Sequence, residues 1–132
     1  MRKTYTLNVA GVTRELPLCP VNEKLDIAAF VMFSDVELTV ACAEALLKKV
    51  PEFDVILTAE ASGIALASIC ALRFGVPMVF AKKAKSDNIE GGLYQSDIYS
   101  YTYQKKVTLI ASKDWIKSTD KVLIVDDFMA NG

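Results

Sequence analysis

The stretch that most constrains the fold runs from Lys121 to Gly132 and reads K-V-L-I-V-D-D-F-M-A-N-G. Its four branched apolar residues, Val122 to Val125, suit a central parallel strand buried on both faces, where a continuous apolar run replaces the alternation of a solvated sheet. Asp126 and Asp127 follow at the expected strand end, and open α/β sheets bind ligands outside the carboxyl ends of their strands. The sequence therefore predicts an α/β fold with an acidic site at this edge.

The acid pair is compatible with more than one kind of protein. Small and turn-forming residues follow it, and their backbone N–H groups suit an anion-binding loop: Ala130, Asn131 and Gly132. A core strand that ends in a solvated acidic turn is one alternative. A phosphoacceptor receiver domain is another, but its acid pair belongs to the first strand and most of the domain follows it. That order disfavours a receiver here.

Composition narrows the class of protein. The 132 residues are 52% hydrophobic with a net charge of −1, which excludes general disorder and argues against a nucleic-acid-coating protein. No apolar run approaches the roughly 18 to 20 residues that cross a bilayer, and the N-terminus lacks the continuous apolar core of a signal peptide. We expect a single domain that binds neither nucleic acid nor membrane.

Histidine is absent from the chain, which removes Ser-His and Cys-His nucleophile pairs and histidine-based metal sites. The three cysteines, Cys19, Cys42 and Cys70, form no C-x-x-C pair, and two of them lie in alanine-rich helical patterns. We interpret them as structural residues in a reducing, cytoplasmic compartment.

The first third of the chain predicts a hairpin and a helix. Strands are expected over 4–9 and 12–18 around Ala10-Gly11, with Pro17 and Pro20 ending the second arm. Ser34 and Glu37 match a capping box that opens a helix over about 35–49. The buried side of that helix is expected to carry Leu38, Cys42 or Ala41, Ala45 and Leu46.

The next segment predicts a right-handed βαβ unit with a parallel sheet. Strands are expected over 54–58 and 77–81, with a helix from Ile64 to Phe74 that Gly75 ends. A polar, glycine-containing loop follows, and 96–102 and 107–111 are expected to be antiparallel strands. That polar loop is expected between Lys82 and Asp97 and is interpreted as flexible.

Three candidate sites fall on one sheet edge. The turn from Glu60 to Ile64 offers free backbone N–H groups and the Ser62 hydroxyl to an anion. Lys82, Lys83 and Lys85 supply cations at the next strand end, and Asp126-Asp127 supply the acid pair. Each has an ordinary structural explanation alone, but their order along the chain favours a common site.

These segments together resemble the type I purine phosphoribosyltransferases, nearest the bacterial xanthine phosphoribosyltransferase branch. The resemblance rests on E-A-S-G-I, on F-A-K-K-A-K-S from Phe80 to Ser86, on Y-S-Y-T from Tyr99 to Thr102 and on V-L-I-V-D-D-F-M-A-N-G. It covers about 54–132. It implies a twisted, mainly parallel sheet flanked by helices, with residues 1–33 as an N-terminal hairpin and hood and 34–132 as the core. The N-terminal part is only loosely similar and is nearer in layout to the adenine enzymes.

The resemblance implies transfer of ribosyl 5-phosphate from phosphoribosyl pyrophosphate (PRPP) to a purine, with release of pyrophosphate. Asp126 and Asp127 would bind the ribose hydroxyls and are the catalytic candidates, while Phe128 would stack on the base. The remaining PRPP-binding candidates are Glu60, Ala61, Ser62, Gly63, Lys82, Lys83, Lys85, Ala130, Asn131 and Gly132.

The same resemblance implies Mg²⁺ as cofactor, carried by PRPP, with Asp126 as the one side chain considered as a ligand. It also implies a homodimer and closure of the 83–104 loop over the site. The phosphate loop is expected to be incomplete at Gly132, so we expect weak turnover or none from the 132 residues alone. A xanthine-type acceptor is favoured; the alternatives are an adenine enzyme and a PRPP-sensing transcriptional regulator of the same fold.

Overall fold

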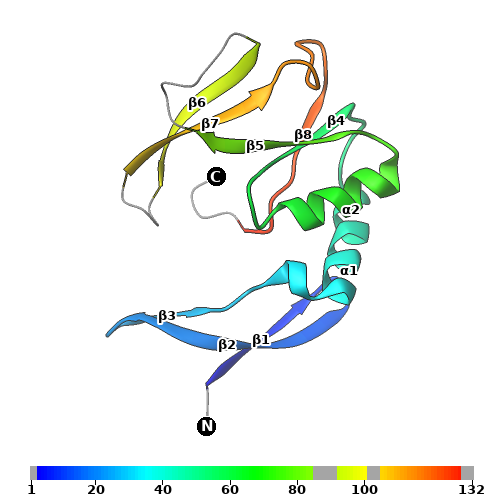
Figure 1. Ribbon diagram of the computed structural model, residues 1–132. Coiled ribbons are helices and arrows are strands. Elements are labelled where there is room, and N and C mark those ends of the chain that lie inside the picture. Colours follow the sequence, from blue (N-terminus) through cyan, green and yellow to red (C-terminus); the bar gives the residue numbers. More distant parts are fainter. Residues whose placement is uncertain (1–2, 85–91, 101–104, 129–132) are drawn as a thin grey trace.

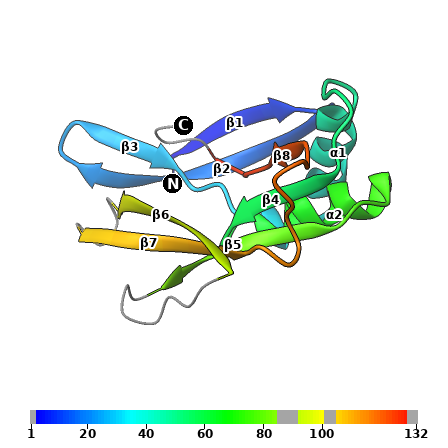
Figure 2. The same ribbon diagram turned by 90° about the horizontal axis from the view of Figure 1, so that it is seen from above.

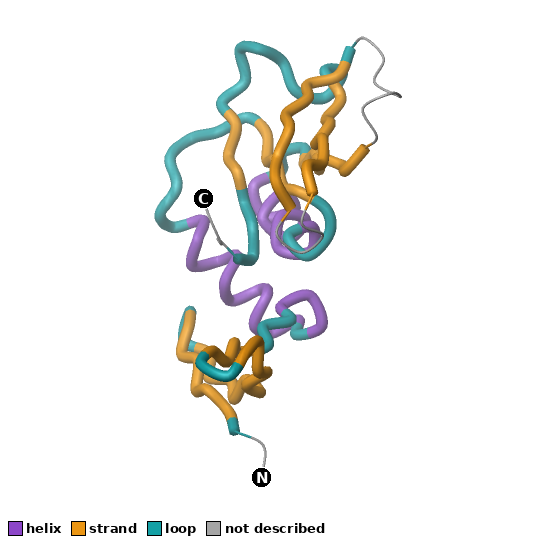
Figure 3. Tube along the Cα trace, turned by 90° about the vertical axis from the view of Figure 1, so that its left-hand side faces the viewer, coloured by secondary structure: helices purple, strands orange, loops and turns teal. Residues whose placement is uncertain are grey.

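The computed structural model describes residues 3–84, 92–100 and 105–128 (Figure 1). These residues form a three-stranded sheet, two α-helices and a five-stranded sheet. Figures 1 and 3 show the helices between the two sheets. The predicted α/β class is therefore confirmed, with both helices on the side of the larger sheet that faces the smaller one.

The smaller sheet contains β1 (Thr4–Val9), β2 (Val12–Asn22) and β3 (Leu25–Ala28), all antiparallel. Ala10 and Gly11 connect β1 to β2 with positive φ angles of 52° and 76°, which suits a two-residue hairpin turn. The prediction that prolines end the second arm is wrong, because β2 continues through both. Pro17 lacks an N–H but keeps its carbonyl, which accepts a hydrogen bond of 2.8 Å from the Ala29 N–H.

A 3-10 turn (Met32–Ser34) leads into α1 (Val36–Leu47). The helix is capped by Asp35 and not by Ser34: the Asp35 carboxylate accepts a 3.1 Å hydrogen bond from the Leu38 N–H, whereas Ser34 is part of the preceding turn. The buried side carries Leu38, Thr39, Cys42 and Ala43. The prediction is confirmed for Leu38 and Cys42, but Leu46 is 40% exposed and does not belong to the buried side.

The predicted βαβ unit is confirmed. It consists of β4 (Val55–Ala59), α2 (Ile64–Phe74) and β5 (Met78–Ala84), and the two strands pair in parallel. Gly75 ends α2 in the left-handed conformation, with a φ of 68°. The core lies where α1 packs on α2 and α2 packs on β4. Its buried members are Met32, Leu38, Cys42, Ala43, Ile56, Leu66, Ala67, Cys70, Ala71 and Val125.

Strands β6 (Leu93–Ser100) and β7 (Lys105–Ser112) form the expected antiparallel pair. They divide the region predicted as one loop over 83–104: β5 extends to Ala84, and β6 occupies most of the second half. Residues 85–91 and 101–104 lie outside the described residues. Because β7 pairs antiparallel with β5, the larger sheet is mixed and not mainly parallel.

The apolar run near the C-terminus forms β8 (Val122–Ile124), which pairs in parallel with β4. The strand order is β6-β7-β5-β4-β8, so β8 lies at an edge of the described sheet and the prediction of a central strand is wrong. Only one face of the run packs on the core, and Ile124 is 74% exposed. Figure 2 shows β5 and β8 on opposite sides of β4. β4 thus has a parallel neighbour on each side, and ligands of open α/β sheets bind outside the carboxyl ends of such strands.

Candidate functional site

The site is built where β4 and β8 end side by side. The Val125 N–H donates a 3.0 Å hydrogen bond to the Leu57 carbonyl. This bond holds the chain beside β4 up to the residue before the acid pair. The Ser62 hydroxyl, on the turn between β4 and α2, donates a 3.1 Å hydrogen bond to the Asp127 carboxylate. Figure 1 shows this end of the described chain returning to the beginning of α2. The structure therefore brings together two of the predicted elements, the β4–α2 turn and the acid pair.

Gly63 is the point of closest approach between these elements. A Cβ on Gly63 would meet Asp126 Oδ1 at 2.7 Å and would lie closer still to Thr58 Oγ1. The φ angle of Gly63 is −79°, an ordinary helical value, so the glycine is required by the close approach and not by its backbone conformation. The Glu60–Ala61 peptide bond in the same turn is cis.

The two carboxylates influence each other. The pKa of Asp126 is raised above its ordinary value, first because burial removes solvent from the carboxylate and then because Asp127 lies beside it. The Asp127 N–H donates a 2.8 Å hydrogen bond to Asp126 Oδ1 and opposes that effect. An acceptor pair of this kind favours ligands that bring hydroxyl donors or a cation.

The predicted lysines are not all placed together. The Lys83 N–H donates a 2.6 Å hydrogen bond to Glu60 Oε1, which joins the end of β5 to the β4–α2 turn. The Lys82 ammonium group lies 5.6 Å from the centre of the Phe80 ring. Lys85 lies outside the described residues, as do Ala130, Asn131 and Gly132.

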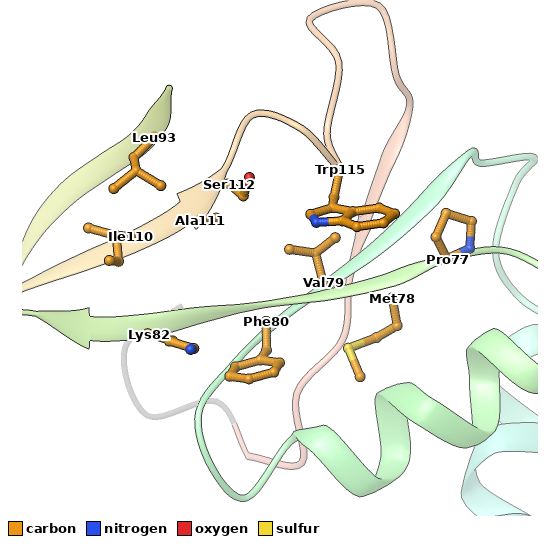
Figure 4. A pocket seen from close by; sticks show the side chains of 10 residues that line it. All are labelled: Pro77, Met78, Val79, Phe80, Lys82, Leu93, Ile110, Ala111, Ser112 and Trp115. Atoms are coloured by element: carbon orange, nitrogen blue, oxygen red, sulfur yellow. The ribbon is translucent and has the colours of Figure 1, made fainter. Parts of the chain in front are cut away.

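Lys82 also lines a cavity of about 620 Å³ beside β5 and β7, called here the tryptophan cavity. Figure 4 shows Val79 pointing toward Trp115 on one side of β5, with Phe80 and Lys82 on the other. The full lining is Pro77, Met78, Val79, Phe80, Lys82, Leu93, Ile110, Ala111, Ser112 and Trp115. This cavity could not be predicted from the sequence, because its residues come from three strands and a turn that only tertiary structure brings together.

A second cavity, of about 660 Å³, lies between the small sheet and α1 and reaches the acid pair. We call it the hairpin cavity. Phe128 lines it with a side chain that is 70% exposed, and Tyr5 and Phe30 contribute aromatic rings from the N-terminal region. Its other lining residues are Leu7, Val9, Ala10, Leu16, Ala28, Met32, Cys42, Ala45, Leu46, Lys49, Leu66, Asp126 and Asp127. Apolar walls with carboxylates at one end suit a flat heteroaromatic ligand attached to a polar group.

The described residues contain no group of three or more His, Cys, Asp or Glu side chains placed to hold a metal ion. The oxygen donors that are present, the two carboxylates and nearby hydroxyls, are of the kind that Mg²⁺ prefers, and they fit an ion that also takes ligands from a bound phosphate group. No helix within the described ranges is long and apolar enough to span a bilayer.

Comparisons with known proteins identify the family of the chain. The family model described as phosphoribosyl transferase domain matches residues 37–132. The xanthine phosphoribosyltransferase of Lachnoclostridium phytofermentans is 56% identical over 77 residues, which are 58% of this chain and 40% of that protein. The xanthine phosphoribosyltransferase of Staphylococcus carnosus is 53% identical over the same shares. The matched part thus spans about 40% of the length of these curated relatives.

Solved structures share the fold at lower sequence identity. The adenine phosphoribosyltransferase of Thermoanaerobacter pseudethanolicus has a TM-score of 0.65 and 23% identity, over 85% of this chain and 66% of that one. The Giardia lamblia enzyme complexed with 9-deazaadenine has a TM-score of 0.60 and 23% identity, over 83% and 61%. Because the family model matches residues 37–132, most of its length, the chain belongs to the phosphoribosyl transferase domain family.

Proposed function

We propose that this chain transfers ribosyl 5-phosphate from PRPP to a purine nitrogen and releases pyrophosphate. The observation that carries the proposal is the 3.1 Å hydrogen bond from Ser62 to Asp127. This bond joins the β4–α2 turn, which is suited to bind an anion, to the acid pair, which is suited to accept hydrogen bonds from hydroxyl groups. Membership of the phosphoribosyl transferase domain family supports the same chemistry.

The residues supply positioning and charge in this reaction. Asp126 and Asp127 accept hydrogen bonds from the ribose hydroxyls, and the turn from Glu60 to Gly63 binds pyrophosphate through backbone N–H groups. Lys82, Lys83 and Lys85 add positive charge at the neighbouring strand end. The bond from ribose C1 to the pyrophosphate oxygen breaks, a bond from the purine nitrogen to C1 forms, and that nitrogen loses its proton. The transition state resembles an oxocarbenium ion, so fixed carboxylates beside the ribose stabilise it.

Phosphate contacts complete the proposed PRPP site. Ala130, Asn131 and Gly132 are proposed to hold the 5′-phosphate. Mg²⁺ is the proposed cofactor, and when bound it neutralises charge on the departing pyrophosphate. Asp126 is the side chain that could reach the ion from the protein, and the remaining ligands would be phosphate oxygens and water.

The purine is proposed to lie in the hairpin cavity against Phe128. The sequence relatives are xanthine phosphoribosyltransferases, which favours xanthine or another 6-oxopurine as the acceptor. The adenine enzymes among the solved structures are less than 25% identical, so they support the fold alone and leave adenine as the alternative acceptor.

A homodimer in the cytoplasm is also proposed. Exposed apolar residues at the start of α1 and just before it support association, since Val31, Phe33 and Val36 are 50%, 57% and 72% exposed. A patch of this kind is available to a second copy of the chain.

The test is pyrophosphate release from PRPP and Mg²⁺, measured with xanthine, hypoxanthine, guanine and adenine in turn and with no base as the control. The criterion is dependence on the base, whatever the absolute rate. Release that requires a purine, and is fastest with xanthine, is the expected result. Release that is equal with and without every base would contradict the proposal.

A further inference from the structure

Thr58 stands out among the described residues because its hydroxyl is buried without a partner. The residue is 2% exposed, and Oγ1 is the one buried side-chain nitrogen or oxygen in the described part of the chain that has no hydrogen bond. A buried hydroxyl without a partner costs free energy, so such a group calls for a reason. Thr39 provides the contrast: it is equally buried, yet its hydroxyl donates to the Met32 and Asp35 carbonyls at 2.6 and 2.8 Å.

The Thr58 hydroxyl is directed toward the acid pair. Thr58 Oγ1 and Asp126 Oδ1 both abut the position that a Gly63 Cβ would occupy. Gly63 carries only a hydrogen atom at that position, so no side chain of Gly63 comes between the two oxygens. Thr58 lies inside β4, directly after Leu57, which pairs with Ile124 of β8. Asp126 lies beyond the end of β8.

We propose that Thr58 is a positioning residue for Asp126: its buried hydroxyl donates a hydrogen bond to the Asp126 carboxylate when PRPP is bound, and holds it in the orientation that receives the ribose hydroxyls. The inference rests on the proposed function and extends it to a residue of the β4 interior. Thr58 itself touches neither the ribose nor the pyrophosphate. The Thr58 hydroxyl makes no other hydrogen bond among the described residues, so it is available to the carboxylate.

The test compares Thr58→Val, which keeps the shape and removes the hydroxyl, with Thr58→Ser, which keeps the hydroxyl. Dissociation constants are measured by titration calorimetry for two probes, PRPP and pyrophosphate, each with Mg²⁺. Because both probes bring Mg²⁺ and only PRPP brings the ribose, the difference between the probes isolates the contacts of Asp126 with the ribose from any contact with the ion. Melting temperatures of all variants are recorded, and Thr39→Val is the matched control for removal of a buried hydroxyl.

The expected result is a separation of stability from binding. Thr58→Val melts at or above the wild-type temperature, since it removes an unpartnered hydroxyl, but binds PRPP about tenfold more weakly with unchanged affinity for pyrophosphate. Thr58→Ser binds both probes as the wild type does. Thr39→Val shows the opposite pattern, with a lower melting temperature and unchanged binding of both probes.

Three outcomes would overturn the inference. Equal PRPP affinity in Thr58→Val and wild type would show that the hydroxyl has no positioning role. Equal weakening by Thr58→Ser, or equal weakening for both probes, would assign the effect to packing. A wild-type chain that binds neither probe would overturn the proposed function and the Thr58 inference with it, whereas in the first two cases the proposed function stands.

Discussion

The Ser62 hydroxyl donates a 3.1 Å hydrogen bond to the Asp127 carboxylate, although 65 residues separate the two along the chain. The bond joins the turn proposed to bind pyrophosphate to the carboxylate proposed to bind the ribose. Ser62→Ala should therefore weaken PRPP binding about threefold to tenfold, the effect of one hydrogen bond. Titration calorimetry measures this, and Ser118→Ala, in the exposed turn before β8, is the control. Identical PRPP affinities in the three proteins would refute a linking role for Ser62.

Gly63→Ala tests the close approach between the β4–α2 turn and Asp126. The new Cβ would lie 2.7 Å from Asp126 Oδ1 and 3.4 Å from Asp126 Cα, so the carboxylate must move. We expect a loss of about 1–3 kcal/mol in the free energy of unfolding, as for other overpacked sites, together with loss of PRPP binding. Denaturant unfolding and PRPP titration provide the two readouts. Adding Thr58→Ala to Gly63→Ala removes the other obstructing atom, so the double variant should lose less stability than the sum of the single losses. Strict additivity would contradict the contact geometry.

The stabilisation that the Arg14–Asp35 ion pair provides between the small sheet and α1 should depend on pH. The Arg14 guanidinium, bonded at 2.6 Å to Asp35 Oδ2, holds the pKa of Asp35 below its ordinary value of 3.8, with help from the Leu38 N–H. A lowered folded-state pKa means that this stabilisation is fully present above the unfolded pKa and is lost as the pH falls through the folded pKa. The melting temperature should therefore decrease below about pH 4. Arg14→Met should lower it at pH 7 and flatten the decrease. If the melting temperature of Arg14→Met decreases at acid pH as much as that of the wild type, the ion pair has no such role.

Phe128 is expected to act on the base and not on PRPP. Its side chain is 70% exposed at the edge of the hairpin cavity, where a purine ring could stack on it. Phe128→Ala should raise the KM for the purine about threefold to tenfold and leave PRPP affinity unchanged, while Phe128→Trp should retain purine binding. Phe33→Ala, at an exposed aromatic outside the cavity lining, is the control. If Phe128→Ala loses PRPP affinity and keeps its purine KM, the ring contacts PRPP and the prediction is wrong.

The βαβ unit could be predicted from local signals. The boundaries of α2 are marked by Gly63 and Gly75, and the apolar runs on either side are short enough to be strands only. The cap of α1 was harder, because Ser34 and Asp35 are adjacent and both are good caps; which one is used depends on the 3-10 turn before the helix. Local sequence thus predicts the elements better than their ends.

The order of strands could not be predicted from the same signals. The apolar run Val122–Val125 indicates burial, but its neighbours in the sheet come from elsewhere in the chain, and only β4 pairs with it among the described residues. Thr58 could not be singled out at all, because a threonine in a buried strand is ordinary until its hydroxyl is known to lack a partner. The hairpin cavity likewise depends on where the small sheet lies relative to α1.

The central claim is that the ends of β4 and β8 form one PRPP site, and titration of PRPP with Mg²⁺ into the chain tests it most directly. Asp126→Asn and Asp127→Asn are measured beside the wild type, with Asp114→Asn, in the exposed turn after β7, as the charge-matched control. The account predicts that the wild type and Asp114→Asn bind PRPP equally and that each strand-end variant binds it at least about tenfold more weakly, since each loses a charge-assisted hydrogen bond to the ribose. Equal binding by all four proteins, or no binding by any of them, would contradict it.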